Sequence, residues 1–342
     1  MTSAEVRPLE WVEDHLLMLD QTALPLAENY LEIRDVDSLV DAIVRLVVRG
    51  APALGASGAY GVGLAMVQGE REGWDDSRLQ SEIDRIRDAR PTAVNLAWGV
   101  AQVRPHVSSG LAAVLAAADA VWSADAAGNR AMGEIGADWI EKHVTRRPIR
   151  IITHCNTGPI ATTEWGTALG VIRTLHERGL VELVYADETR PLLQGARLTA
   201  WELGRAGIPH VVQADGAAAS TILRGLVDVA LIGADRIAAN GDTANKVGSV
   251  GLAIACKEAG IPFLSVAPTT TVDLDTKHGD DIHIELRSGD EVVNFAGQRT
   301  APIDSKGFNP AFDVTPARYI SAIITEVGAI EVAEGETPAS RL

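Results

Sequence analysis

Two side chains that could carry acid–base or nucleophilic chemistry come shortly after apolar, β-branched runs of the sequence. Cys155 follows Ile149–Thr153 and His154, and Asp235 follows Val229–Ile232 after a short Gly-Ala step. In a parallel sheet covered by helices, ligands bind beyond the carboxyl ends of the strands. We therefore expect a thiol and a carboxyl at one edge of such a sheet, where both could act on one ligand.

The surroundings of Cys155 allow two interpretations. A helix is expected to begin near Thr157, and the N–H groups and dipole at a helix N-terminus favour a thiolate, which could serve as a base or a nucleophile. A lone cysteine is also commonly a buried structural thiol, and position alone leaves both interpretations open. Cys256 directly follows the apolar stretch Leu252–Ala255, so we expect it in the core.

Asp235 has a similar ambiguity. The apolar run Val229–Ile232 in front of it predicts a carboxyl that is shielded from water, which would raise its pKa and suit a general acid. The alternative is an Asp that caps a helix or pairs with Arg236. Spacing alone does not decide between these roles.

Three cations stand where they could bind a phosphate. Arg49 and Arg90 each lie beside a turn marked by Gly or Pro, in Arg49-Gly50-Ala51-Pro52 and Arg90-Pro91-Thr92. Lys246 lies in Asn245–Gly248, where we expect a helix to open, and main-chain N–H groups together with one ammonium bind phosphate well. Each residue alone could equally be a helix-end cap or a solvated surface side chain.

The elements that must position these residues are those of an α/β fold. After Pro148, short β-branched runs alternate with helical stretches about every thirty residues, which is typical of a parallel sheet covered on both faces. The expected strands are Ile149–Thr153, Val181–Ala186, Val211–Ala214, Val227–Ile232 and Pro262–Val266, with helices beginning near Thr157, Gln194, Gly216, Lys246 and Pro316.

The part before this sheet is predicted to be mostly helical, with few strand signals. Val36–Val48 has helical spacing, and Gly50 and Pro52 mark the start of another helix. Residues 50–69 lack charges, but their Gly, Ala and Ser content favours a buried, tightly packed helix over a membrane span. We divide the chain into an N-terminal domain, residues 1–123, and a Rossmann-like domain, residues 124–342.

Composition excludes several classes of protein. The chain has 342 residues and 46% hydrophobic content, so it can form a large core. Its net charge is −16, and it has only two cysteines. Its acidity argues against nucleic acid or membrane partners, and its few cysteines argue against a disulfide scaffold or a structural zinc site. The acidic start of the sequence lacks the pattern of a signal peptide, so we expect a cytoplasmic protein.

Motifs for the common cofactors are missing from the sequence. There is neither a phosphate loop of the Gly-x-x-x-x-Gly-Lys type nor a dinucleotide-binding Gly-x-Gly-x-x-Gly after a strand. His154 and His210 have no metal-ligand spacing. A nucleotide- or metal-dependent enzyme therefore loses most of its support.

Taken together, the motifs resemble the methylthioribose-1-phosphate isomerase family, which is related to the regulatory subunits of the eukaryotic translation initiation nucleotide-exchange factor. The resemblance covers nearly the whole chain. It is carried by 49–53 (RGAPA), 90–95 (RPTAVN), 153–158 (THCNTG), 187–191 (DETRP), 194–199 (QGARLT), 233–237 (GADRI), 240–242 (NGD), 245–246 (NK) and 309–313 (NPAFD).

The resemblance implies that Cys155 and Asp235 are the catalytic pair. It implies a substrate site made by Arg49, Gly50, Ala51, Arg90, Gln194, Asn245 and Lys246. A small N-terminal domain, a Rossmann-like C-terminal domain, a homodimer and the absence of any metal or organic cofactor are implied in the same way.

The implied reaction converts 5-methylthioribose 1-phosphate to 5-methylthioribulose 1-phosphate in methionine salvage. Asp235 would protonate the ring oxygen, and hydrogen would move from C2 to C1 with Cys155 as the base or as a hydride. Pro159 and the Met-free segment 213–217 depart from the family pattern. A 5-deoxyribose 1-phosphate or ribose 1,5-bisphosphate isomerase therefore stays open, as does a non-catalytic regulatory subunit.

Overall fold

The computed structural model describes residues 6–90 and 94–342. The chain forms two compact units: Met1–Arg130 with Thr157–Gly166, and Ala131–Asn156 with Thr167–Leu342. The division falls within helix α5 (Leu111–His143), as does the boundary expected after residue 123. One short segment of the later sequence, Thr157–Gly166, therefore packs with the first unit.

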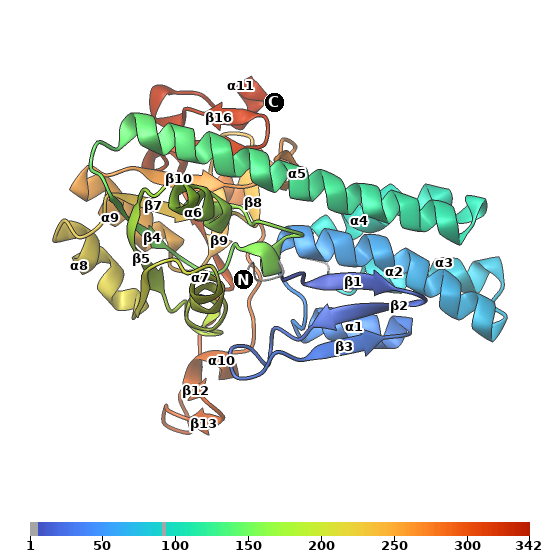
Figure 1. Ribbon diagram of the computed structural model, residues 1–342. Coiled ribbons are helices and arrows are strands. Elements are labelled where there is room, and N and C mark those ends of the chain that lie inside the picture. The colour runs from blue at the N-terminus through green and yellow to red at the C-terminus, as the bar shows by residue number, and fades with distance from the viewer. Residues whose placement is uncertain (1–5, 91–93) are drawn as a thin grey trace. The chain divides into compact units, whose positions relative to one another are not determined.

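The first unit combines a small antiparallel sheet with a group of helices (Figure 1). Its strands follow one another in the order β1-β2-β3. The mostly helical character expected for this part is confirmed, but the three strands within residues 9–33 were not predicted, because each is only four or five residues long and β1 and β3 have a glutamate within their apolar pattern. The elements are β1 (Leu9–Val12), β2 (His15–Leu19), β3 (Tyr30–Ile33), α1 (Val36–Val44), α2 (Ala51–Glu72), α3 (Asp76–Arg87), α4 (Val94–Val103), η1 (Arg104–Ser109) and η2 (Pro159–Ala161).

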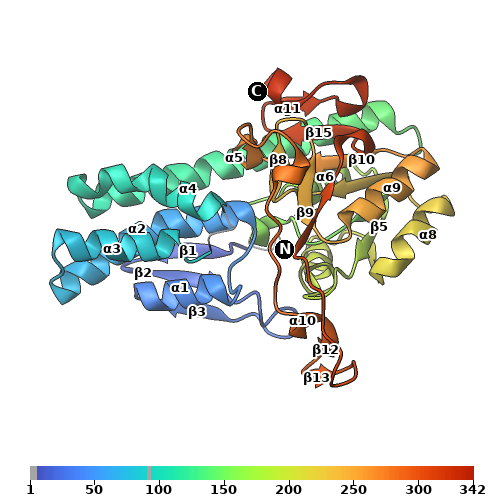
Figure 2. The same ribbon diagram turned by 180° about the vertical axis from the view of Figure 1, so that it is seen from behind.

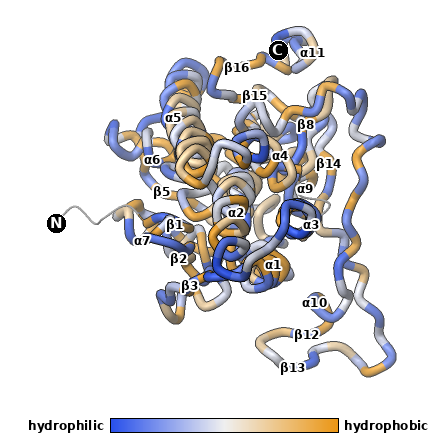
Figure 3. The backbone as a smooth tube through the Cα atoms, turned by 90° about the vertical axis from the view of Figure 1, so that its right-hand side faces the viewer, coloured by the Kyte–Doolittle hydropathy of each residue, from blue (hydrophilic) through white to orange (hydrophobic). Residues whose placement is uncertain are grey.

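Helix α2 is the buried centre of this unit, as its small residues predict. A Cβ atom added at Gly58 would lie 2.6 Å from the carbonyl oxygen of Leu96 in α4, and one at Gly99 would lie 1.9 Å from that of Gly55. Glycine is therefore required for α2 and α4 to approach this closely. Helix α3 is hydrophilic apart from its buried Ile83 and Ile86, so it covers the outside (Figure 3).

Helix α5 is, in the part of the chain that the structure describes, the one helix whose length and composition would suffice to cross a membrane. Its buried residues join the cores of both units, Val114 and Trp122 in the first and Met132 and Ile140 in the second. Its apolar character is thus used at least in part for packing within the protein.

The second unit is built on a seven-stranded sheet in the order β16-β15-β10-β7-β4-β5-β6. All neighbours are parallel except β15 and β16. The five expected strands are confirmed, at β4 (Ile149–Thr153), β5 (Val181–Asp187), β6 (His210–Gln213), β7 (Val229–Ile232) and β10 (Phe263–Val266), and β15 (Ala322–Thr325) and β16 (Gly328–Ile330) complete the sheet.

Helices cover both faces of this sheet, which makes it the Rossmann-like fold expected (Figures 1 and 2). The end of α5 and α6 (Ala168–Glu177) pack on one face, while α8 (Ala218–Leu223) and α9 (Ser249–Ala259) pack on the other. Cys256 is buried in the second of these layers, which confirms its assignment to the core.

Two expected helices are absent from the described residues. No α-helix begins near Thr157, where only the turn η2 forms, and none begins near Pro316, where the 3₁₀ turn η7 (Ala317–Tyr319) leads straight into β15. The run Ala322–Thr325 is fully buried between two strands, so sheet pairing overrides the helical spacing there.

A second, smaller sheet holds β9 beside the main one. Its order is β11-β8-β9-β14. Its strands are β11 (Val272–Asp273), β8 (Arg236–Ala238), β9 (Thr243–Lys246) and β14 (Phe312–Thr315). Between β11 and β14 the chain makes an excursion with α10 (Asp290–Val293), β12 (Asn294–Phe295) and β13 (Gln298–Arg299) (Figure 2). The remaining short elements are η3 (Gly195–Thr199), α7 (Ala200–Arg205), η4 (Asp215–Ala217), η5 (Thr269–Thr271), η6 (Gly279–Asp281), η8 (Val332–Glu334) and α11 (Pro338–Arg341).

Candidate active site

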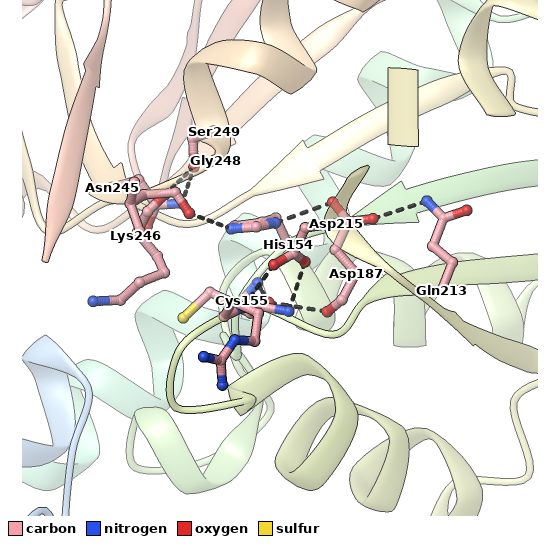
Figure 4. Close-up of polar contacts among 12 residues, drawn as sticks. His154, Cys155, Asp187, Gln213, Asp215, Asn245, Lys246, Gly248 and Ser249 are labelled. Atoms are coloured by element: carbon pink, nitrogen blue, oxygen red, sulfur yellow. Dashed lines mark hydrogen bonds and ion pairs between the residues drawn. The ribbon is translucent and has the colours of Figure 1, made fainter. Parts of the chain in front are cut away.

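The carboxyl end of β4 is fixed by a buried histidine. His154 is 1% exposed, its Nδ1 lies 3.0 Å from Asp187 Oδ2 at the end of β5, and its Nε2 lies 2.9 Å from the carbonyl oxygen of Val247, just after β9. Figure 4 shows the ring beside Asp187, between that carboxylate and the Asn245–Lys246 end of β9. One side chain thus connects three segments that are far apart in the sequence and brings the Cys155 loop next to the Asn245–Lys246 segment.

Burial and charge act in opposite directions on this pair. Burial disfavours the charged ring, but the hydrogen bond and negative charge of Asp187 outweigh it and raise the pKa of His154. Burial also raises the pKa of the Asp187 carboxyl, against the lowering effect of His154. Asp187 Oδ1 accepts a hydrogen bond of 2.8 Å from Gln213 Nε2, which holds the second carboxylate oxygen in place.

Cys155 sits in a strained turn, and the helix expected after it is not there. Its φ of 64° is left-handed, a conformation that costs a non-glycine residue about 1–2 kcal/mol. Neighbours hold it in place: its N–H donates to Thr189 Oγ1 at 2.9 Å, and its carbonyl accepts from Thr199 Oγ1 at 2.6 Å. The next α-helix along the chain begins only at Ala168, so the half-buried thiol does not lie at the start of the helix expected near Thr157.

The loop after β5 is shaped by a single carboxylate. Asp215 Oδ1 accepts from the Thr189 N–H at 2.7 Å, and its Oδ2 accepts from the Arg190 N–H at 2.6 Å. Thr189 itself is left-handed, with a φ of 65°. Asp215 thereby positions Thr189, which in turn positions Cys155.

Donor atoms of His154, Asp187 and Asp215 lie within 4.8 Å of one another, the one grouping in the described part of the chain close enough for a metal ion. Each of these atoms is already engaged, since Nδ1 faces Asp187 and both Asp215 oxygens accept backbone N–H groups. A metal would have to displace these bonds. The arrangement is that of a hydrogen-bonded network.

Asn245 and Lys246 end strand β9, and the helix expected to begin near Lys246 is α9, which starts at Ser249 with Gly248 as its N-cap. Asn245 Nδ2 donates to Ser249 Oγ at 2.9 Å. The buried Lys246 Nζ donates to the carbonyl oxygen of Ala311 at 2.6 Å and lies 4.5 Å from the centre of the Phe312 ring. Figure 4 shows the Cys155 thiol and the Lys246 ammonium on the same side of the His154 ring.

The start of α9 does not offer the phosphate site expected from the sequence. Asp313 Oδ2 accepts hydrogen bonds from the N–H groups of Gly248, at 2.8 Å, and Val250, at 3.2 Å. Burial raises the pKa of this carboxyl, and its Oδ1 is buried with no hydrogen-bond partner among the described residues. An anion here would meet a carboxylate that already occupies the helix N-terminus.

Asp235 is exposed, contrary to the shielded carboxyl expected from the apolar run before it. The apolar strand β7 ends at Ile232, and Gly233 and Ala234 carry the chain out of the sheet before Asp235 is reached. Its N–H donates to the carbonyl oxygen of Ala244 at 2.8 Å, which places its backbone beside β9, next to Asn245.

Gln194 has the kind of buried acceptor that a ligand would satisfy. The residue is 6% exposed, and its Oε1 has no hydrogen-bond partner in the described part of the chain. An unsatisfied buried polar atom costs about 1–3 kcal/mol. The helical segment that follows lies against β5, since a Cβ at Gly195 would lie 1.7 Å from the carbonyl oxygen of Asp187.

The remaining expected substrate residues, Arg49, Gly50, Ala51 and Arg90, belong to the first unit. Gly50 is the N-cap of α2 and has a φ of 95°, and a Cβ there would lie 2.2 Å from the carbonyl oxygen of Ala161, so only glycine fits. Ala51 is the first residue of α2, whose cap makes no side-chain hydrogen bond. Pro91, Thr92 and Ala93, which complete the Arg90 motif, lie outside the described residues.

Sequence reasoning missed the roles of His154 and Asp313. His154 was set aside because it lacks metal-ligand spacing, yet its position between the strand and Cys155 was a usable signal: a histidine at the end of a buried strand needs partners for both ring nitrogens. Nothing in the sequence indicates that Asp313 caps a helix more than sixty residues earlier, which tertiary contact alone decides.

The model of the initiation factor 2 subunit family matches residues 47–332. A probable bifunctional methylthioribose-1-phosphate isomerase/methylthioribulose-1-phosphate dehydratase from Nocardia farcinica is 48% identical over 98% of this chain, which spans 61% of that relative's length. A methylthioribose-1-phosphate isomerase from Pseudomonas syringae pv. tomato is 45% identical, over 97% of this chain and 94% of the relative.

Two solved structures are similar over almost the whole chain. A 5-methylthioribose 1-phosphate isomerase from Pyrococcus horikoshii has a TM-score of 0.88 and 36% identity, and covers 99% of this chain and 95% of its own. The translation initiation factor eIF-2B, subunit delta, from A. fulgidus has a TM-score of 0.84 and 39% identity, with 95% and 96% covered.

Proposed function

Because the chain belongs to the initiation factor 2 subunit family and resembles its methylthioribose-1-phosphate isomerases over nearly its full length, we propose that it is an aldose–ketose isomerase of this kind. Its substrate would be 5-methylthioribose 1-phosphate, and its product 5-methylthioribulose 1-phosphate, a step of methionine salvage. The observation that carries the proposal is the network that holds Cys155, in a strained turn, beside the Asn245–Lys246 segment.

Cys155 and Asp235 are the proposed catalytic pair. Asp235 donates a proton to the ring oxygen as the bond from C1 to that oxygen breaks, which leaves C1 electron-poor. Hydrogen then moves from C2 to C1, either as a proton taken and returned by the Cys155 thiolate or as a hydride. The C2 hydroxyl becomes the ketone and gives its proton back to Asp235, so the cycle closes without any external reactant.

The other residues bind the substrate in this proposal. The unpartnered Oε1 of Gln194 accepts a hydrogen bond from a sugar hydroxyl, which would remove its desolvation cost. Lys246 contributes positive charge beside the thiol, and Asn245 fixes the strand end that carries it. Arg49, Gly50, Ala51 and Arg90 bind phosphate; for Gly50 and Ala51 the support is the N-terminus of α2, where N–H groups favour an anion.

The test is an isomerase assay on the purified protein without added metal. We expect conversion of methylthioribose 1-phosphate, and loss of turnover by at least about a hundredfold in Cys155→Ser and Asp235→Asn, as for residues that transfer protons. Cys256→Ala is the matched control, because it removes the other cysteine from the core and should leave turnover intact. Turnover that survives in Cys155→Ser would refute the assignment.

The substituent at C5 is tested in the same assay. Gln213, in the segment that departs from the family pattern, is used to hold Asp187, so it is committed to the network and cannot easily contact a substrate as well. Comparing the methylthio sugar with 5-deoxyribose 1-phosphate and ribose 1,5-bisphosphate would show which C5 group is preferred. A higher kcat/KM for either alternative sugar would change the proposed substrate to that sugar and leave the proposed reaction unchanged.

A non-catalytic regulatory subunit is the second candidate, favoured by the similarity to the eIF-2B delta subunit. The strained turn at Cys155 argues against it, because a scaffold has no need to hold a thiol in an unfavourable conformation. The absence of turnover with all three sugars would favour this candidate.

We further propose that the protein works as a homodimer in the cytoplasm. Strand β6 is one edge of the main sheet, and its Val211 and Val212 are 41% and 46% exposed, so a dimer contact at β6 would cover that edge. Size-exclusion chromatography with light scattering measures the mass of the protein in solution. We expect the mass of a dimer for the wild type and the mass of a monomer for Val212→Lys. For the location, fractionation of cells is the test, and a membrane-bound or exported pool would contradict it.

A further inference from the structure

His154 is a buried titratable group that the proposed reaction leaves without a role. Its ring is 1% exposed, and both of its nitrogens face oxygen atoms: a carboxylate oxygen of Asp187 at 3.0 Å and the carbonyl oxygen of Val247 at 2.9 Å. A carbonyl oxygen can only accept, so Nε2 must carry a hydrogen. If Asp187 is ionised, Nδ1 must carry one too, and the ring is an imidazolium.

The surroundings favour that ionised pair over a neutral imidazole facing a protonated Asp187. A histidine ordinarily holds its proton to a much higher pH than an aspartate does. The second oxygen of Asp187 accepts from Gln213 at 2.8 Å, which stabilises the carboxylate form. Acidic groups face the ring from three elements, Asp187 from β5, Asp215 from η4 and Asp313 from β14, and the charges of Asp187 and Asp215 both favour a positive His154.

This positive charge lies one residue from Cys155, on the same loop. A cation beside a cysteine favours its thiolate, which is the form that can act as a base. The helix expected to begin near Thr157 could have done this, but no α-helix begins between Cys155 and Ala168. His154 also ties the loop to the carbonyl of Val247, next to Lys246, so the same bond fixes where the thiol stands.

We propose that His154 is a positioning residue for the reaction, a buried imidazolium that keeps Cys155 as a thiolate and holds its loop against the end of β9. The inference deepens the proposed function, because it assigns the group that prepares the proposed catalytic thiol. Asp187 supplies the counter-charge and keeps the ring protonated. The charges of His154 and Asp187 are therefore as necessary for the thiolate form of Cys155 as the hydrogen bonds that these two side chains make.

The experiment measures the rate of alkylation of Cys155 by iodoacetamide against pH, followed by mass spectrometry without substrate. Cys256 is an internal control for folding, since it is fully buried and burial raises the pKa of its thiol to about 12. In the wild-type protein we expect Cys155 to react with a midpoint well below that of an ordinary thiol, near pH 8.5. A midpoint at or above that value would overturn the proposal.

The variants separate charge from structure. Asp187→Asn keeps the shape and can keep a hydrogen bond to the ring but removes the counter-charge, and His154→Gln removes the imidazolium. Both should raise the midpoint by about one pH unit, which is about a tenfold slower reaction at a pH well below both midpoints, while Cys256 stays protected. Lys246→Met is the matched control for the neighbouring cation. A shift in Lys246→Met alone would assign the charge to Lys246 and refute the role of His154.

If the variants unfold, which reactive Cys256 would report, the wild-type protein decides the matter by NMR. In protein labelled with ¹⁵N at histidine, we expect at pH 8 one ring with both nitrogens protonated, where ordinary histidines are neutral. The absence of such a ring refutes the proposal. Neither measurement needs turnover. If the protein is an active isomerase but the variants leave the alkylation midpoint of Cys155 unchanged, this inference alone is overturned. If the variants shift that midpoint but the protein has no isomerase activity, only the proposed function is overturned.

Discussion

Gly248 is the position at which a single added carbon should disturb the proposed site most directly. Its φ of 113° is one that other residues rarely adopt, and a Cβ there would lie 2.8 Å from Cε1 and 2.9 Å from Nε2 of His154. In Gly248→Ala the left-handed backbone alone costs about 1–2 kcal/mol. The ring must also move, which weakens its buried hydrogen bond to the Val247 carbonyl oxygen and costs about a further 1–3 kcal/mol.

Gly260→Ala is the matched control for this change. Gly260 ends the same helix, α9, with a φ of 68°, but a Cβ there would meet no described atom within 4 Å. We expect the free energy of unfolding of this variant to fall only by the contribution of the left-handed backbone, about 1–2 kcal/mol. The difference between the two variants therefore isolates the contact with the His154 ring.

The assay is alkylation of the buried Cys256 at increasing urea concentrations, which reports opening of the second unit's core. Gly248→Ala should open more readily than Gly260→Ala by roughly a factor of ten for each 1.4 kcal/mol of difference. It should also lose turnover, while Gly260→Ala should retain it. Equal opening and equal turnover in the two variants would refute the claim that the ring must occupy this space.

Three further outcomes test the structure elsewhere. Gln194→Leu should raise KM by about tenfold and leave the unfolding midpoint unchanged or higher, because the lost Oε1 has no described protein partner; a lower midpoint with unchanged KM would contradict its binding role. Gly50→Ala should destabilise the first unit by at least about 2 kcal/mol in urea unfolding, whereas Gly110→Ala, left-handed but in open space, should cost less. Asp228→Asn should lower the free energy of unfolding by about 1–3 kcal/mol at pH 7. Burial raises the pKa of Asp228, but the hydrogen bonds from Arg150 outweigh burial and lower it, so this stability is present above the unfolded-state pKa and is lost as the pH falls through the lower folded-state pKa. Urea unfolding at pH 7 and pH 3 should show that the difference between variant and wild type shrinks in acid.

Local sequence was a reliable guide where one short segment settles its own environment. The five strands expected from β-branched runs all form. Strands β4, β7 and β10 are buried almost throughout, as continuous apolar runs predict, whereas β6 forms as a partly exposed edge strand. The small residues of 51–72 gave α2 as a tightly packed helix for the same kind of reason. Strands β1 to β3 were missed, since each has only four or five residues, and β1 and β3 also contain a glutamate, which leaves too weak a pattern.

Local sequence failed where distant contacts decide. The chain after Asn156 packs with the first unit up to Gly166, so the helix expected at Thr157 does not form in that segment. Cys155 adopts a left-handed turn because two threonines from later elements bind its backbone, and no pattern within residues 150–160 encodes them. The exposure of Asp235 likewise follows from where β7 ends in the sheet.

By itself, then, the sequence determined the α/β class and the strands that support the proposed site, and it supplied the thiol, carboxyl and cations that the proposal uses, since these depend on residue type and short-range periodicity. Only the tertiary structure decided which of them meet. The pairing of His154 with Asp187 and Val247, and the capping of α9 by Asp313, join segments dozens of residues apart, and such contacts form only when the whole sheet has assembled.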